Sequence, residues 1–335
     1  MNGFSLGDLA QTYMLQRRGA ALKADMGRIT QELATGQVSD AKSVLAGNID
    51  YFTSMENDLN GLAGYRVAIS EVAQFADAAQ TVLDRVGARV GDLSAKYLSI
   101  ASNSFGPVLD QFSTEAALEL DTIVGALNTT TGGRSIFAGR ATDQPALQSA
   151  ETILGELRIA TAGATDADSL MQAAELWFDD PNGFATLAYT GSDDALAPFR
   201  LGDDETVEMA LTANNSAFRD VLLQVSVAAI SNDPGYNLST EDRQALLRDT
   251  GQRLFQAQDG VTGARASVGF LQARVDAVST QNSTQEFALM SARNALLQVD
   301  PYEAATELEA VQFQLQSLYA ITARMSDMSF VNYIR

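Results

Sequence analysis

The sequence predicts a mainly α-helical protein: an elongated antiparallel coiled-coil rod of long helices, with a small α+β domain inserted at the tip. Hydrophobic residues make up 46% of the chain but aromatic residues only 7%, which favours long, closely packed helices rich in alanine. Apolar residues recur with helical spacing toward both ends of the 335 residues, and a segment of mixed texture separates these stretches. An antiparallel arrangement brings both helical arms together and leaves that segment at the far end.

The N-terminal arm is expected to contain helices at about 5–34, 40–101 and 114–128. Gly36 ends the first of them, and the Asn, Gly and Pro of 103–107 separate the second from the third. Glycine lowers the stability of a helix interior, so we expect close packing or slight bends at the glycines of the second helix, which are Gly61, Gly64, Gly87 and Gly91.

The pattern of apolar and turn-forming residues changes at Thr129, and it remains a mixture of helix, strand and turn signals to about Ser216. One helix is expected at 168–178. Short apolar runs between turn residues predict strands, and these runs are 136–138, 157–160, 186–189, 199–201 and 207–211.

The C-terminal arm is expected to contain helices at 217–231, 240–297 and 301–335, with Pro301 well placed to begin the last. We therefore expect a terminal helical domain for assembly, a domain of long helices, and an outward-facing insert. Their ranges are 1–36 with 300–335, 37–140 with 217–299, and 141–216.

Both terminal helices carry apolar residues at alternating steps of three and four, which is the pattern of a seam for another helix. These seams could pair within one chain or be offered to other copies, and we expect burial between molecules. The predicted assembly residues are Leu15, Leu22, Met26, Ile29, Leu33, Leu308, Val311, Leu315, Leu318, Met325, Met328 and Phe330.

Composition excludes several classes of function. The chain has no cysteine and no histidine, which removes disulfides, Cys-rich zinc sites and Ser-His or Cys-His catalysis. A formal net charge of −20 disfavours binding to nucleic acid. No stretch is apolar enough to insert into a membrane, and the N-terminal residues do not resemble a cleaved signal peptide.

Candidate chemical sites are few. The acidic groups at 179–180, 193–194 and 203–205 lack calcium-loop spacing and are interpreted as solvated turns. Gly132-Gly133-Arg134 lacks the lysine of a phosphate-binding loop, and Trp177-Phe178 is interpreted as part of the insert core. We therefore predict no catalytic residue, cofactor or metal.

Segments spread along the chain resemble the flagellin-like axial proteins of the bacterial flagellum. Glu32-Leu33-Ala34-Thr35-Gly36 resembles the Leu-Ser/Ala-Thr-Gly end of their first helix. Ile136-Phe137-Ala138-Gly139 with Thr142-Asp143-Gln144-Pro145 resembles the opening of their variable insert, and Tyr189-Thr190-Gly191 a segment inside it. The stretch 300–334 resembles the terminal helix of the family but lacks the Gln-Ala-Asn-x-x-Pro ending of filament flagellins, which favours the hook–filament junction branch.

The resemblance implies a structural, non-enzymatic protein of the extracellular flagellum, exported without a cleaved signal. It implies assembly with other copies of the chain, with the sister junction protein next to the hook, and with flagellin. It also implies terminal helices that order on assembly, and an export chaperone on the C-terminal helix. Filament flagellin and a secreted coiled-coil adhesin or translocator remain alternatives, and an enzyme in the insert is the least favoured.

Overall fold

The protein is described by a computed structural model, which covers residues 6–40, 49–100 and 106–334, with side chains from 10 to 325 within these ranges. The chain forms two compact units. We name Met1–Gly61 with Ser283–Arg335 the terminal unit, and Leu62–Asn282 the central unit. The helices are α1 (Leu6–Thr35), α3 (Ile49–Leu98), α4 (Gly106–Leu127), α5 (Ala150–Ala160), α6 (Ala167–Asp179), α7 (Phe184–Leu187), α8 (Ser216–Ile230), the 3-10 helix η1 (Pro234–Tyr236), α9 (Thr240–Leu297) and α10 (Pro301–Ile334).

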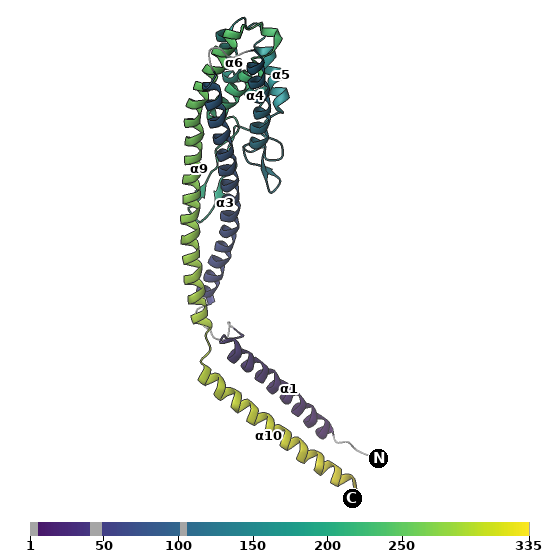
Figure 1. Ribbon diagram of the computed structural model, residues 1–335. Helices are drawn as coiled ribbons and strands as arrows, with labels where there is room; N and C mark the ends of the chain where they lie inside the picture. The colour runs from purple at the N-terminus through teal and green to yellow at the C-terminus, as the bar shows by residue number, and fades with distance from the viewer. Residues whose placement is uncertain (1–5, 41–48, 101–105, 335) are drawn as a thin grey trace. The chain divides into compact units, whose positions relative to one another are not determined.

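The mainly helical fold class is confirmed, with long helices and only small sheets in the described chain (Figure 1). Within the central unit, α3 and α9 run antiparallel: residues later in α3 contact residues earlier in α9. Ile69 and Val72 pack with Val275 and Val278, while Ser94 donates its hydroxyl hydrogen bond to the Gly251 carbonyl at 2.9 Å. The part of α3 inside this unit extends about 55 Å at the usual helical rise.

The helix boundaries follow the periodicity closely. The helix expected at 240–297 is α9, with the same bounds, and α10 begins at Pro301 as predicted. The third helix begins earlier than expected, at Gly106, because Pro107 lies in the first turn, where its missing N–H costs no helical hydrogen bond. The expected start of the second helix partly falls on 41–48, and its end partly on 101–105, which lie outside the described residues.

The strand predictions in the insert are mostly wrong. Residues 157–160 belong to α5, whose N-cap Ser149 accepts a hydrogen bond from the Thr152 amide. Residues 186–189 begin inside α7. Ile136, Phe137 and Ala138 are buried but follow β2 instead of forming a strand. Short apolar runs fit a helix as well as a strand, and the buried residues of α5 recur at helical spacing, at Ala150, Ile153, Leu154 and Leu157.

The sheets are two short antiparallel hairpins. β1 (Thr130–Thr131) pairs with β2 (Arg134–Ser135) around Gly132 and Gly133, which both have positive φ, as a two-residue hairpin turn requires. β3 (Phe199–Arg200) confirms the strand expected at 199–201 and pairs with β4 (Thr206–Val207), which is shorter than the expected 207–211.

The main core lies in the central unit around α4 and α8, and it includes the insert helices. Phe137 packs edge-on against Phe218 of α8, with ring centroids 5.5 Å apart. Trp177 and Phe178 of α6 pack with Phe184 and are all buried, which confirms the interpretation of this aromatic pair as insert core.

Glycine permits close packing where α9 crosses α3. A Cβ at Gly251 would lie 2.9 Å from the Cβ of Tyr97 and 3.1 Å from the Leu98 amide nitrogen. Gly87 and Gly91 likewise face Val261 and Gln258, whereas Gly61 and Gly64 face open space. Close packing therefore explains only some of the glycines in this helix.

We expect Gly251→Ala to lower the free energy of unfolding of the central unit by about 1–3 kcal/mol, because the added methyl group overpacks a crossing made partly of backbone. Gly263→Ala on the same helix is the matched control, since a Cβ there meets nothing within 4 Å. The control should be neutral or stabilising by up to about 1 kcal/mol. Urea unfolding of both variants measures the difference, and equal stabilities would contradict the packing argument.

Candidate functional site: the paired terminal helices

In the terminal unit, α1 and α10 lie side by side and run antiparallel (Figure 1). A Cβ on Gly19 would lie 3.2 Å from the Cδ2 of Leu318. Further along α1, Arg28 forms an ion pair with Glu307, and beyond its end Gln37 forms a β-bridge with Gln298. Contacts thus move toward the start of α10 as α1 proceeds to its end.

The predicted seam residues face each other across this helix pair. Leu22 and Ile29 of α1 are buried together with Ala304, Val311 and Leu318 of α10. Half-buried neighbours complete the cluster, and these are Leu15, Met26, Leu33, Val299, Leu308 and Leu315. Of the two arrangements that the seam pattern allowed, the structure therefore contains the one in which a chain pairs its own ends.

The end of the predicted set is only partly described. Met325 is half-buried, and Gln11 donates a hydrogen bond to its sulfur at 3.8 Å. Met328 and Phe330, with the other side chains after Met325, lie outside the described residues.

Large apolar side chains also point away from the seam, and the predicted set did not include them. On α10, Tyr302 is 82% exposed and Phe313 is 71% exposed. On α1, Tyr13 and Met14 are exposed as well. Tyr302 and Phe313 are eleven residues apart, close to three helical turns, so they share a face. Phe313 follows the buried Val311 by two positions, which on a helix places it on the side opposite the seam. This spacing could have identified it from the sequence. We name Tyr13, Met14, Tyr302 and Phe313 the outer apolar residues.

A cation covers part of one further aromatic ring on α10. Lys23 of α1 places its ammonium 5.8 Å from the ring centroid of Tyr319, within the range of a cation–π interaction. Tyr319 is still half-exposed. The helix pair therefore has a closed inner seam and an outer surface that is more apolar than a solvated helix face requires.

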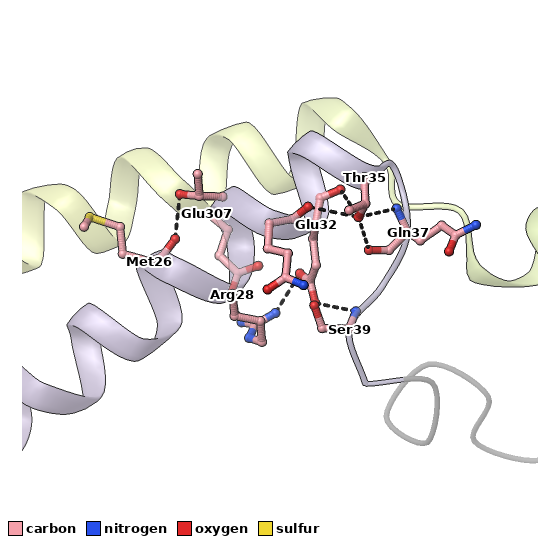
Figure 2. A network of polar contacts seen from close by, with 9 residues as sticks. Met26, Arg28, Glu32, Thr35, Gln37, Ser39 and Glu307 are labelled. Carbon is pink, nitrogen blue, oxygen red and sulfur yellow. Dashed lines mark hydrogen bonds and ion pairs between the residues drawn. The ribbon is translucent and has the colours of Figure 1, made fainter.

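Polar contacts close the base of the helix pair, at the segment we name the joint (36–39 with 297–299). Figure 2 shows Glu32, Thr35, Gln37 and Ser39 converging where α1 ends. Gly36, with φ of 70°, donates its amide hydrogen bond to the Glu32 carbonyl at 2.8 Å, as in a left-handed helix cap. The predicted stop at Gly36 is therefore confirmed.

Glu32 is a buried carboxylate at this base. It accepts hydrogen bonds from the Ser39 amide and from Nη1 of Arg28, each at 2.9 Å. Burial opposes ionisation, but these hydrogen bonds and the charge of Arg28 outweigh it and hold the pKa of the Glu32 carboxyl below its ordinary value.

The acidic groups of the insert are occupied by ordinary contacts. Asp203 accepts a hydrogen bond from the Tyr65 hydroxyl at 2.7 Å, and Glu205 accepts one from Arg274 at 2.6 Å. Asp193 accepts one from the Asn214 amide. Among the described residues, no group of three or more acidic side chains is placed to hold a metal ion.

The remaining candidate segment is also structural. Gly132 and Gly133 form the turn of the β1–β2 hairpin, and Arg134 forms an ion pair with Glu71 while lying over the ring of Phe75. None of the helices in the described ranges is long and apolar enough to span a lipid bilayer.

Comparison with known proteins gives one match to a family model. Residues 252–334 match the bacterial flagellin C-terminal helical region, and this range includes most of α9 and all of α10. No curated protein is significantly similar in sequence to this chain.

A solved structure shares the fold. A protein of Vibrio parahaemolyticus, assigned as a flagellar hook-associated protein, is 17% identical, with a TM-score of 0.50. The match covers 73% of this chain and 95% of that protein. FlgL of Bacillus cereus is also 17% identical over 73% of this chain and 99% of its own, with a TM-score of 0.49.

Proposed function

We propose, because this chain is flagellin-like in its C-terminal helices, that it is a structural component of the bacterial flagellum. In this role it is an extracellular axial protein without catalytic activity, and it contributes to motility by assembling with other copies of itself. The observation that carries the proposal is the match of 252–334 to the flagellin C-terminal helical region, since that region contains the whole of α10.

We infer that the buried seam and the outer apolar residues of the terminal helices have different roles. The inner seam holds α1 on α10, because Ile29 and Val311 are buried in a common cluster. The outer apolar residues remain for a neighbouring molecule. Burial of one such large side chain stabilises a contact by about 1.5–3 kcal/mol, so a few of them per interface are significant. A heterologous contact of this kind builds a ring or a helical stack.

In finer detail, we propose that the chain joins hook to filament as a junction adaptor. Its partners are then the sister junction protein on the hook side and flagellin on the filament side. An export chaperone would cover the C-terminal helix α10 before assembly. The terminal domain (1–36 with 300–335) assembles, the long-helix domain (37–140 with 217–299) supports it, and the insert (141–216) faces outward.

A filament flagellin is the second candidate, and the same match favours it, because the matching family model is that of flagellin itself. Seeded assembly separates the two candidates. A junction adaptor should add to existing ends without propagating, whereas a flagellin should elongate the seeds.

We expect purified chain, added to flagellin filament fragments, not to extend them, since a junction subunit presents different surfaces to its two neighbours. Electron microscopy of filament lengths before and after addition measures the outcome, and authentic flagellin is the positive control. Long filaments grown from the pure chain would contradict the junction role and would leave the flagellar assignment intact.

A further inference from the structure

A cavity with mixed polar and apolar lining lies inside the central unit, between α6, α8 and α9. Its volume is about 340 Å³. Each helix lines it with residues three and four positions apart, which is the spacing of a single helix face. Phe178, Leu223 and Ala257 are buried and form apolar walls. The cavity therefore offers an elongated group both an apolar surface and polar partners.

One buried acceptor in this cavity has no donor. Gln224 lines the cavity and is 3% exposed, and its Oε1 has no hydrogen-bond partner. A buried polar group without a partner lowers stability, and a leucine of similar shape would avoid that cost. The Gln224 amide is therefore placed to receive a donor that enters the cavity.

Two carboxylates of the cavity lining have no cation. Asp220 lies one helical turn before Gln224 on α8, and Asp179 is the last residue of α6. Neither carboxylate forms an ion pair or a hydrogen bond within the described residues. Although much of Asp220 is exposed, partial burial raises the pKa of its carboxyl against the charge of Arg219, and Asp179 raises it further. Unpaired negative charge beside an unused acceptor favours a positively charged ligand.

The two arginines that line the cavity are committed to other groups. Arg253 forms ion pairs with Glu175 and Asp249, each at 2.6 Å. Arg219 donates from Nη1 to the Phe178 carbonyl at 3.2 Å, and its Nε is buried without a partner. A ligand that brings a peptide carbonyl together with its cation would satisfy this last donor as well.

We propose that the cavity binds a primary ammonium group on an alkyl stem, with Asp179, Asp220 and Gln224 as its acceptors. An ammonium group has three donors and no acceptor, which matches two carboxylates and one amide oxygen. The stem of a lysine side chain packs along apolar surface while its charged end meets polar groups, and the apolar walls provide that surface. The source of the group is a lysine of another polypeptide or a free amine. The site lies in the central unit, so it requires neither the proposed flagellar role nor ordered terminal helices.

The single tryptophan of the chain can report occupancy, because Trp177 packs on Phe178 of the cavity wall with ring centroids 5.0 Å apart. Fluorescence of the full chain is titrated at constant ionic strength with N-acetyl-lysine-methylamide and with 1-aminobutane. We expect a saturable change with both probes. Tighter binding of the lysine probe identifies a polypeptide as the source, and equal binding identifies a free amine. The norleucine analogue, which has the stem without the ammonium group, should give no saturable change.

Variants of the acceptors complete the test. Asp220→Asn and Gln224→Leu should each weaken binding of the lysine probe by about tenfold, the effect of losing one hydrogen bond from a charged group. Gln224→Leu should also keep or raise the midpoint of urea unfolding, because it removes an unsatisfied buried group, so its loss of binding would not reflect loss of the fold. Asp276→Asn is the matched control and should bind as the wild type does, since Asp276 is an exposed residue of α9 about 24 Å beyond Gly260.

No saturable change with either amine would overturn the site. It would also be overturned if Asp220→Asn and Gln224→Leu both bound the lysine probe with wild-type affinity. A norleucine probe that binds as tightly as the lysine probe would show that the cavity recognises the stem alone, and it would overturn the role of the ammonium group.

Discussion

Deleting residues 301–335 should abolish attachment of filaments to hooks while leaving the central unit folded. The deletion removes α10, and with it Ala304, Val311 and Leu318, the buried residues that cluster with Leu22 and Ile29 of α1. The clusters that form the core of the central unit contain no residue of α10, so their packing should persist. Motility and electron microscopy of cells that express only the truncated chain measure attachment, and circular dichroism of the purified protein measures folding.

A full-length chain with Ile159→Ser is the control for this deletion. Ile159 is an exposed apolar residue of α5, in the insert, and its loss removes apolar surface without touching the terminal helices. Cells with this variant should remain motile. Filaments that still attach in the truncated strain would show that α10 is not needed for assembly, and loss of the central-unit helical signal would show that the two units do not fold separately.

The double variant Tyr13→Ser/Phe313→Ser, which removes two of the exposed aromatic side chains, should prevent assembly without unfolding the subunit. Both side chains are largely exposed and point away from the seam, and substitutions at such surface sites usually change stability by less than about 0.5 kcal/mol. Assembly would lose two apolar anchors, and removal of interface hot spots costs about 2 kcal/mol or more each. Thermal unfolding of the subunit and sedimentation of assembled material give the two readouts.

The inner seam offers the contrasting variant. Ile29 is fully buried, so Ile29→Ala should lower the stability of the α1–α10 pairing by about 2–5 kcal/mol. It should impair assembly only through that loss. If the outer double variant assembles normally while Ile29→Ala does not, the seam itself and not the outer face would be the surface that matters between molecules.

Most of the helices could be predicted from the sequence because their signals are local. The apolar stripe of α9 recurs at helical spacing from Leu246 to Val278, and Pro301 marks the start of α10. Most of the strands predicted in the insert were wrong, because its apolar runs are too short to distinguish strand from helix. Residues 157–160 show this, since they lie in α5 and only Leu157 among them is buried.

In the candidate site too, some residues could be predicted from the sequence and others could not. The seam residues could be identified from their spacing, but spacing does not identify the helix that covers them. In this structure α1 is covered by α10 of the same chain. Tyr13 and Phe313 became candidates only once the seam was closed and the opposite face was seen to remain apolar. Glu32 looked like an ordinary residue of a helix end until folding brought it to the Ser39 amide.

Periodicity, composition and the signals at Gly36 and Pro301 are properties of neighbouring residues, so the primary structure alone specifies long helices with apolar stripes and no histidine or cysteine chemistry. The pairing of 36–39 with 297–299, the closure of the seam and the exposure of the outer aromatic rings depend on residues more than 250 positions apart. Contacts of that range exist only after the chain has folded back on itself, because no local preference records which distant segment will lie alongside.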